Sequence, residues 1–173
     1  MKYEIEKAIE VLSRTPLVLE TLLTGLSNDW THNNEGPDTW SPFEVVGHLI
    51  VNEETNFLPR AQLILSNQQP KVLSSISMTA HLERFNDISI DKLLQMFRDL
   101  RKQNVVILQS LSISNSDLTK TVIHPKVGTV QLSNVLSTWV THDLIHIAQI
   151  SRVMAKQYKN EVGPFIEFLP RLQ

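Results

Sequence analysis

The chain has 173 residues, 42% hydrophobic and 20% charged, which is long enough to bury the core of one globular domain. Its net charge of −2, from 16 basic and 18 acidic side chains, provides no basic footprint for nucleic acid. The absence of cysteine excludes disulfides, thiolate metal sites and a cysteine nucleophile. We therefore expect a single domain over residues 1–173 with no nucleic-acid partner, and any metal must be bound by nitrogen or oxygen.

The lengths of the apolar runs and the composition of the N-terminus indicate where in the cell the protein is found. No apolar stretch approaches the ~18–20 residues that span a bilayer. The first ten residues carry Glu4, Glu6 and Glu10 among apolar side chains, which fits neither a secretory signal nor an Arg-rich transit peptide. These features predict a cytoplasmic protein without a membrane partner.

The first helical region is predicted over residues 3–26. Only five glycines and long runs of Leu, Ile and Val favour helices throughout the chain. A break or kink is expected at Thr15-Pro16, because Thr15 can cap a new helix that has Pro16 at its first position.

The second helix has the clearest start in the sequence. Ser-Pro-Phe-Glu over residues 41–44 combines a capping box with proline at the first helical position. Apolar residues then recur with a helical period as far as Leu65. Pro59 lies inside this run and should kink the helix.

A third helix is predicted over residues 90–111, capped by Ser89. Before it, residues 67–87 form a long polar connection. After it, residues 112–130 form another, in which residues 121–130 could make a short hairpin.

The fourth helix is predicted over residues 131–158, with Gly163-Pro164 stopping it and residues 165–173 forming a tail. Four helices joined by long connections predict an all-α four-helix bundle, whose topology need not be simple up-and-down.

Two histidines on the fourth helix, His142 and His146, are candidate metal ligands. Their i,i+4 spacing puts both imidazoles on one face, where two ring nitrogens can bind one metal at ~2.0–2.1 Å. The spacing alone is weak evidence, because such pairs also occur as exposed or hydrogen-bonded histidines.

Asp143, beside the first of these histidines, falls within the apolar stripe of the same helix. A carboxylate there is costly unless it is paired. A nearby cation or the N–H of a ligand histidine would relieve that cost. A Trp, Thr or backbone donor would relieve it equally well, and both interpretations stay open.

His48 is the candidate third ligand, although it lies away from the main apolar stripe of the second helix. It shares its side of the helix with Asn52 and Thr55, while Glu53 is turned away. That column is either exposed polar surface or the wall of a pocket between the second and fourth helices. Gly47 would permit a close helix approach and so favours the pocket. The remaining histidines are expected to be solvated: His32, His81 and His124.

The sequence resembles the DinB/YfiT-like superfamily of bacterial metal-binding four-helix bundles. The resemblance rests on residues 40–50, where one histidine follows Trp-Ser-Pro, and on residues 139–150, which contain His-x-x-x-His. It implies a bundle of the DinB/YfiT-like type with long connections, and a homodimer. It also implies a divalent metal ion, nickel or zinc, on His48, His142 and His146, with water in the open positions.

The activity that the resemblance implies is broader, because relatives include metal-dependent hydrolases, thiol transferases and thiol-dependent isomerases. Our first hypothesis is a metal-dependent enzyme acting on a small molecule, either a hydrolase or an S-transferase whose partner is a low-molecular-weight thiol. Asp143 would then orient a ligand histidine or hold a proton, and Asn52 would line the pocket. The alternatives are a bundle that binds metal or a small ligand without catalysis, and a dimerising bundle in which the histidines are coincidental.

Overall fold

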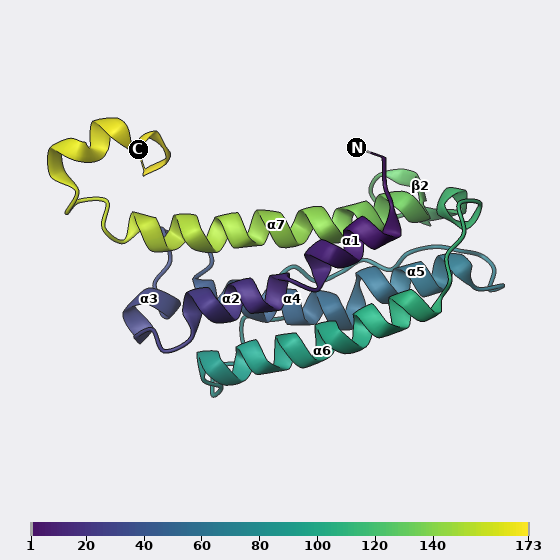
Figure 1. The fold of residues 1–173 in the computed structure, drawn as a ribbon, viewed down its shortest axis with the longest axis horizontal. Coiled ribbons are helices and arrows are strands. Elements are labelled where there is room, and N and C mark those ends of the chain that lie inside the picture. The colour runs from purple at the N-terminus through teal and green to yellow at the C-terminus, as the bar shows by residue number, and fades with distance from the viewer. Residues whose placement is uncertain (1, 173) are drawn as a thin grey trace.

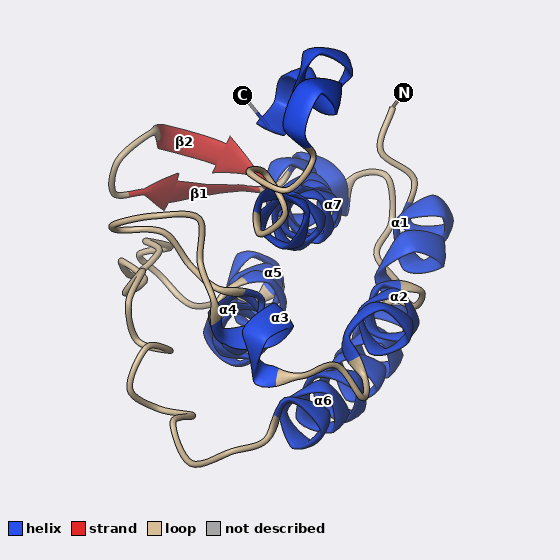
Figure 2. Ribbon diagram, turned by 90° about the vertical axis from the view of Figure 1, so that its left-hand side faces the viewer, coloured by secondary structure: helices blue, strands red, loops and turns tan. Residues whose placement is uncertain are grey.

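The computed structural model describes residues 2–172, and four helical rods run along its long axis (Figures 1 and 2). Two rods are single helices, α6 (Ile90–Ser110) and α7 (Leu132–Lys156). The other two are each broken in the middle: α1 (Ile5–Leu12) with α2 (Thr15–Leu23), and α4 (Pro42–Thr55) with α5 (Phe57–Leu65). The predicted four-helix bundle with long connections is therefore confirmed.

The predicted break in the first rod lies at Thr15-Pro16, and proline is its cause. Pro16 has no N–H to give to the carbonyl of Leu12 four residues earlier. That carbonyl instead accepts a hydrogen bond from Nη1 of Arg101 at 2.9 Å. Thr15 is not the cap we expected, because it is the first residue of α2 and its hydroxyl donates to the carbonyl of Val11 at 3.2 Å.

The second rod begins as predicted and breaks three residues before Pro59. The Ser41 side chain accepts the N–H of Glu44, and the Glu44 carboxylate accepts the N–H of Ser41 at 2.7 Å, which completes the capping box. Asn56 leaves helical geometry, with φ −108° and ψ −92°. The proline ring would clash with the carbonyl of Thr55, so the chain turns there and starts α5 afresh.

The connections hold the remaining elements. The predicted hairpin is confirmed as antiparallel strands β1 (Thr121–His124) and β2 (Gly128–Gln131). A short helix that we did not predict, α3 (Asn28–His32), follows α2. The tail forms 3₁₀ turns beyond the end of α7 (Figure 1). No helix within residues 2–172 is both long enough and apolar enough to cross a membrane.

Two apolar clusters fill the two ends of the bundle. One joins α2, α4 and the start of α6, and includes Leu49 and Phe97. The other joins α1, α5, the start of α7 and the hairpin, and includes Phe57 and Trp139. Between the clusters every rod contributes buried polar side chains, which we call the polar layer: Thr15, His48, Asn52, Glu53, Arg101, Asn104, Asp143 and His146.

Candidate metal centre

Three histidines meet on one side of the polar layer, His48 from α4 and His142 and His146 from α7. Nε2 of His142 lies 3.2 Å from Nε2 of His48 and 3.1 Å from Nε2 of His146. Two nitrogens that each bind one tetrahedral ion at ~2.1 Å are about 3.4 Å apart, so the three rings fit a single metal ion. Within residues 2–172, these are the three His, Asp or Glu side chains whose donor atoms converge closely enough to hold one.

The burial of α4 explains why His48 reaches this point. Both His48 and Asn52 are 3% exposed, so the column they form is a buried wall and not open surface. The close approach that Gly47 permits is made by the 67–87 connection and not by a helix. A Cβ atom at Gly47 would lie 3.0 Å from Cδ2 of Phe85.

All three imidazoles are neutral near pH 7. Burial lowers the pKa of His48 to about 3, helped by the charges of His146 and His81. Burial likewise lowers the pKa of His142 to about 3, helped by His146, His48 and Arg101. Burial also lowers the pKa of His146, although a Gln149 hydrogen bond opposes it. Neutral imidazole is the form that binds metal.

Hydrogen bonds and packing fix the rings. Nδ1 of His146 lies 2.7 Å from Oε1 of Gln149. Because an amide oxygen only accepts, Nδ1 carries the proton and Nε2 presents its lone pair to the other two rings. His142 has no partner at Nδ1, and its ring is held by packing edge-on against Phe57 with centroids 5.2 Å apart.

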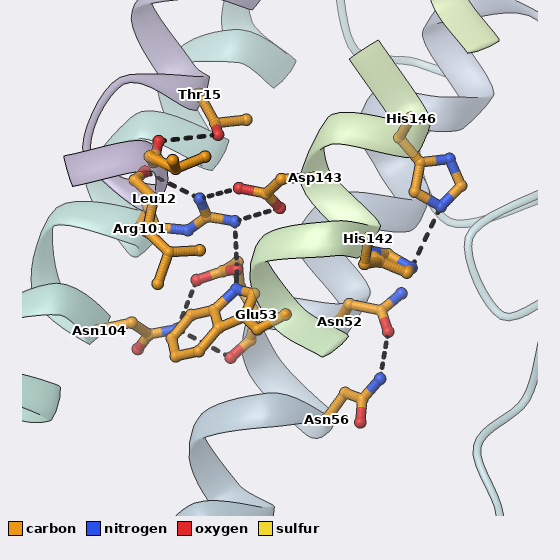
Figure 3. Close-up of polar contacts among 12 residues, drawn as sticks. Leu12, Thr15, Asn52, Glu53, Asn56, Arg101, Asn104, His142, Asp143 and His146 are labelled. Carbon is orange, nitrogen blue, oxygen red and sulfur yellow. Dashed lines mark hydrogen bonds and ion pairs between the residues drawn. The ribbon is translucent and has the colours of Figure 1, made fainter. Parts of the chain in front are cut away.

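Asn52, the predicted pocket residue, lies directly beside the three histidines. Its amide nitrogen donates to the carbonyl of His48 at 2.8 Å, which fixes the amide orientation. The same nitrogen lies 3.0 Å from Nε2 of His48. Its Oδ1 accepts a hydrogen bond from Asn56 at 2.6 Å (Figure 3). Asn52 therefore directs an N–H toward the point where the three nitrogens converge.

Asp143 does not orient a ligand histidine through any hydrogen bond that the described residues make. It points away from His142 and His146, to the opposite side of α7 (Figure 3). Its two oxygens accept from the guanidinium of Arg101, at 2.5 Å from Nη1 and 2.9 Å from Nη2. An arginine on another helix therefore relieves the cost of this carboxylate in an apolar stripe.

Arg101 connects three helices through a fully buried network. Its Nη2 donates to Oε1 of Glu53 at 2.7 Å, and the indole N–H of Trp139 donates to the same oxygen at 2.8 Å. Asn104 donates to Oε2 of Glu53 at 2.9 Å. Burial opposes the charge of Arg101, but Asp143 and Glu53 outweigh it and raise the pKa of the guanidinium.

Sequence reasoning missed Arg101 and Asn104, although a signal was present. The apolar residues of the third helix recur at Leu93, Phe97 and Leu108. Positions 101 and 104 continue that spacing, so each puts a polar side chain where a core residue belongs. A buried arginine requires a carboxylate partner, and Glu53 and Asp143 are the partners it finds.

The outcome for the other three histidines is mixed. His32 is exposed, as predicted, and stacks on Phe43. His124 is half-buried. The prediction for His81 is wrong: it is 3% exposed, packs edge-on against Trp40, and has no hydrogen-bond partner at either ring nitrogen.

A cavity of about 350 Å³ leads to the histidines. His48, Asn52 and His142 line it on the bundle side, and Met78 and Lys126 from the connections line it on the other. This volume is within the range of small-molecule sites. The arrangement is a set of three neutral and largely buried imidazoles, two of which line a pocket.

Comparisons with known proteins agree with this architecture. A family model for the DinB superfamily matches residues 12–150. The solved structure of YfiT from Bacillus subtilis, described as a probable metal-dependent hydrolase with an unusual four-helix bundle topology, superposes with a TM-score of 0.76. The match covers 91% of this chain and 89% of that one at 20% sequence identity, so it concerns the fold. No curated protein matches the sequence.

Proposed function

The chain belongs to the DinB superfamily, and from that premise we propose that it is a metal-dependent hydrolase acting on a small molecule. The observation that carries the proposal is the convergence of three neutral Nε2 atoms, from His48, His142 and His146, beside a cavity of about 350 Å³ that His48 and His142 line. The description of YfiT as a probable metal-dependent hydrolase gives further support.

The donor set favours a divalent ion, zinc or nickel. Imidazole nitrogen suits both metals, and the chain has no thiolate to offer. Structural zinc sites are closed by four protein ligands, whereas catalytic sites use three and keep one position open. When bound, such an ion supplies Lewis acidity and lowers the pKa of bound water.

Asn52 is the side chain we assign to the reacting atoms. The carbonyl of His48 holds one N–H of its amide. The other N–H faces Nε2 of His48 at 3.0 Å, and with a metal on that nitrogen it would be free to donate to an oxygen of the substrate. Asn56 keeps the amide in place from the opposite side by donating to Oδ1. An oriented, buried donor of this kind stabilises negative charge that develops on a reacting oxygen.

Transfer of a low-molecular-weight thiol is the second candidate. One observation favours it: no carboxylate lines the cavity. Both buried carboxylates nearby, Glu53 and Asp143, are engaged by Arg101. A thiol bound to such a metal would be deprotonated outright, whereas bound water would keep a pKa of about 7, so the thiol depends less on a general base. The thiol would arrive as a substrate, because the chain contains no cysteine.

Assays of the protein reconstituted with zinc or nickel separate the candidates. One panel contains esters and amides, and the other pairs glutathione or bacillithiol with an electrophile. We expect hydrolysis, with no activity in His48→Ala. Asn52→Leu should keep its metal and lose about 10²-fold in kcat. Turnover only in the thiol panel would replace hydrolysis by transfer. Full metal content with no turnover in either panel would favour a binding protein that catalyses nothing.

The other sequence expectations stay predictions. We infer that the homodimer implied by the family resemblance forms, and sedimentation equilibrium of the untagged protein would test it. A monomer at all concentrations would contradict that inference and leave the proposed chemistry intact, because all three metal ligands come from one chain.

A further inference from the structure

The cavity that leads to the histidines is lined by cations and by no carboxylate. Arg60 of α5 and Lys126 of the hairpin turn both line it, whereas no Asp or Glu does. His124 of β1 adds a third polar group to the same wall. The wall therefore carries two formal positive charges without a compensating negative one.

The two cations also lack ion-pair partners among the described residues. Arg60 donates only to the backbone carbonyl of Ser74, at 2.9 Å, and Lys126 makes no salt bridge. By contrast, Arg98 pairs with Glu20 and Arg152 pairs with Glu35. Burial lowers the pKa of Arg60. Arg60 is half-buried and Lys126 is exposed, and two cations that line one cavity without counterions are features of an anion site.

His124 can add a hydrogen bond to the same anion. Its Nδ1 accepts the backbone N–H of Lys126 at 3.2 Å. In the neutral ring, the proton must then reside on Nε2, which becomes a donor. The hairpin thus contributes one charged and one neutral donor to the cavity wall.

A polar column on α4 and α5 connects the cations to the histidines. His48, Asn52, Asn56 and Arg60 follow one another at four-residue spacing, and all four line the cavity. Hydrogen bonds join the first three. Oδ1 of Asn56 is buried without a partner in a residue that is 8% exposed. An unsatisfied buried acceptor needs a donor, which water or a bound molecule can supply.

We propose that the substrate is a small anion whose carboxylate or phosphate group binds Arg60 and Lys126, while an N–H or O–H of its middle portion donates to Asn56. Arg60 follows Asn52 by eight residues along the column, with Asn56 between them, so the molecule is extended and its reacting end lies beside Asn52. This inference rests on the proposed function only in calling the bound anion a substrate. The anion site itself does not depend on catalysis.

Three probes of one shape test the anion site: hippurate, its neutral amide hippuramide, and N-benzoylaminomethylphosphonate. Their dissociation constants would be measured by calorimetry and NMR titration up to about 50 mM on the metal-loaded protein. The same titrations on His48→Ala remove any direct binding of the carboxylate to a metal. A partly exposed ion pair changes affinity by about 1.4- to fivefold, so two cations favour hippurate over hippuramide by about 2- to 25-fold.

Variants locate the effect. Arg60→Gln and Lys126→Gln should each lower hippurate affinity by up to about fivefold, and the double variant should bind hippurate and hippuramide equally. Lys159→Gln, in an exposed part of the tail, is the matched control and should leave the ratio unchanged. The ratio of hippurate to phosphonate affinity tells carboxylate from phosphate as the preferred group.

Hippurate that binds no tighter than hippuramide, or not at all by 50 mM, would overturn the proposal. A preference that persists in the double variant would do so too. Failure of the proposed hydrolysis is distinguishable, because no probe needs to be turned over. Anion selectivity without hydrolysis would keep the anion site and reject the hydrolase. Hydrolysis without anion selectivity would reject the anion site alone.

Discussion

Arg101→Met is the substitution that tests the polar layer most severely. Arg101 is 1% exposed and gives hydrogen bonds to Asp143, to Glu53 and to the carbonyl of Leu12. Methionine is flexible and fills most of the same volume, so the loss of packing is small. What the variant removes is the single positive charge between two buried carboxylates.

The expected cost follows from those contacts. Breaking a buried ion pair by removing one partner typically costs about 3–5 kcal/mol. The carbonyl of Leu12, which Pro16 deprives of its helical partner, loses its donor and adds about 1 kcal/mol or more. A total of roughly 4–6 kcal/mol is a large part of the 5–15 kcal/mol that stabilises a typical domain. At about 2–4 °C per kcal/mol, Tm should fall by roughly 10–20 °C.

Urea and thermal unfolding followed by circular dichroism would measure this cost. Arg98→Met is the matched control on the same helix, because its salt bridge with Glu20 is partly exposed and should contribute at most about 1 kcal/mol. Adding Glu53→Gln and Asp143→Asn to Arg101→Met removes the stranded charges. That triple variant should recover at least half of the lost stability.

Two results would refute the reasoning. Arg101→Met within about 1 kcal/mol of Arg98→Met would mean that the network contributes no more than a surface pair. A triple variant less stable than Arg101→Met alone would mean that the carboxylates are not destabilised by losing the arginine.

Three further predictions concern the surroundings of the histidines. His48 and His142 have pKa values of about 3 when folded and about 6.5 when unfolded, so the unfolded chain binds more protons between these values. Metal-free protein should therefore lose about 2 kcal/mol per histidine in urea unfolding from pH 8 to pH 5, and equal stability at both would contradict this. Gly47→Ala should lower Tm despite the helix propensity of alanine, because its Cβ would lie 3.0 Å from the ring of Phe85. A gain of about 1 kcal/mol in the free energy of unfolding would contradict this and show that the ring moves aside at no cost. His81→Leu should leave Tm unchanged or raise it, since neither ring nitrogen has a partner, and a fall of several degrees would reveal a hydrogen bond to water or ligand.

Local chemistry made much of the fold predictable. The starts of α4 and α6 follow from the side chains of Ser41 and Ser89, which accept backbone N–H groups three residues ahead. The two broken rods follow from Pro16 and Pro59, each acting on the residue four positions earlier. These interactions span a few residues, so a single sequence contains all the information they need.

The polar layer depends on partners distant in the sequence, and there local reasoning fell short. Asp143 was recognised as costly, but its partner Arg101 lies 42 residues away. Several donors could have satisfied the carboxylate equally well from the sequence alone. His81 lies in a polar connection that packs closely against Gly47, where a Cβ atom would lie 3.0 Å from Phe85 and 3.6 Å from Cβ of His81.

The three-histidine site combines both kinds of information. The i,i+4 spacing of His142 and His146 is local and was readable directly. His48, 94 residues before His142, was already the candidate third ligand, but its helical wheel left an exposed column as an alternative, and the family resemblance favoured the pocket. Burial of α4 on nearly every side removes that alternative.

Elemental analysis of untagged protein tests the central claim most directly. Wild type would be compared with His48→Ala, with His142→Ala/His146→Ala, and with His32→Ala as an exposed control. We predict about one equivalent of zinc or nickel in wild type and in the control, and none in the other two variants. Wild type that binds neither metal after incubation with both, or variants that keep full metal content, would contradict the account.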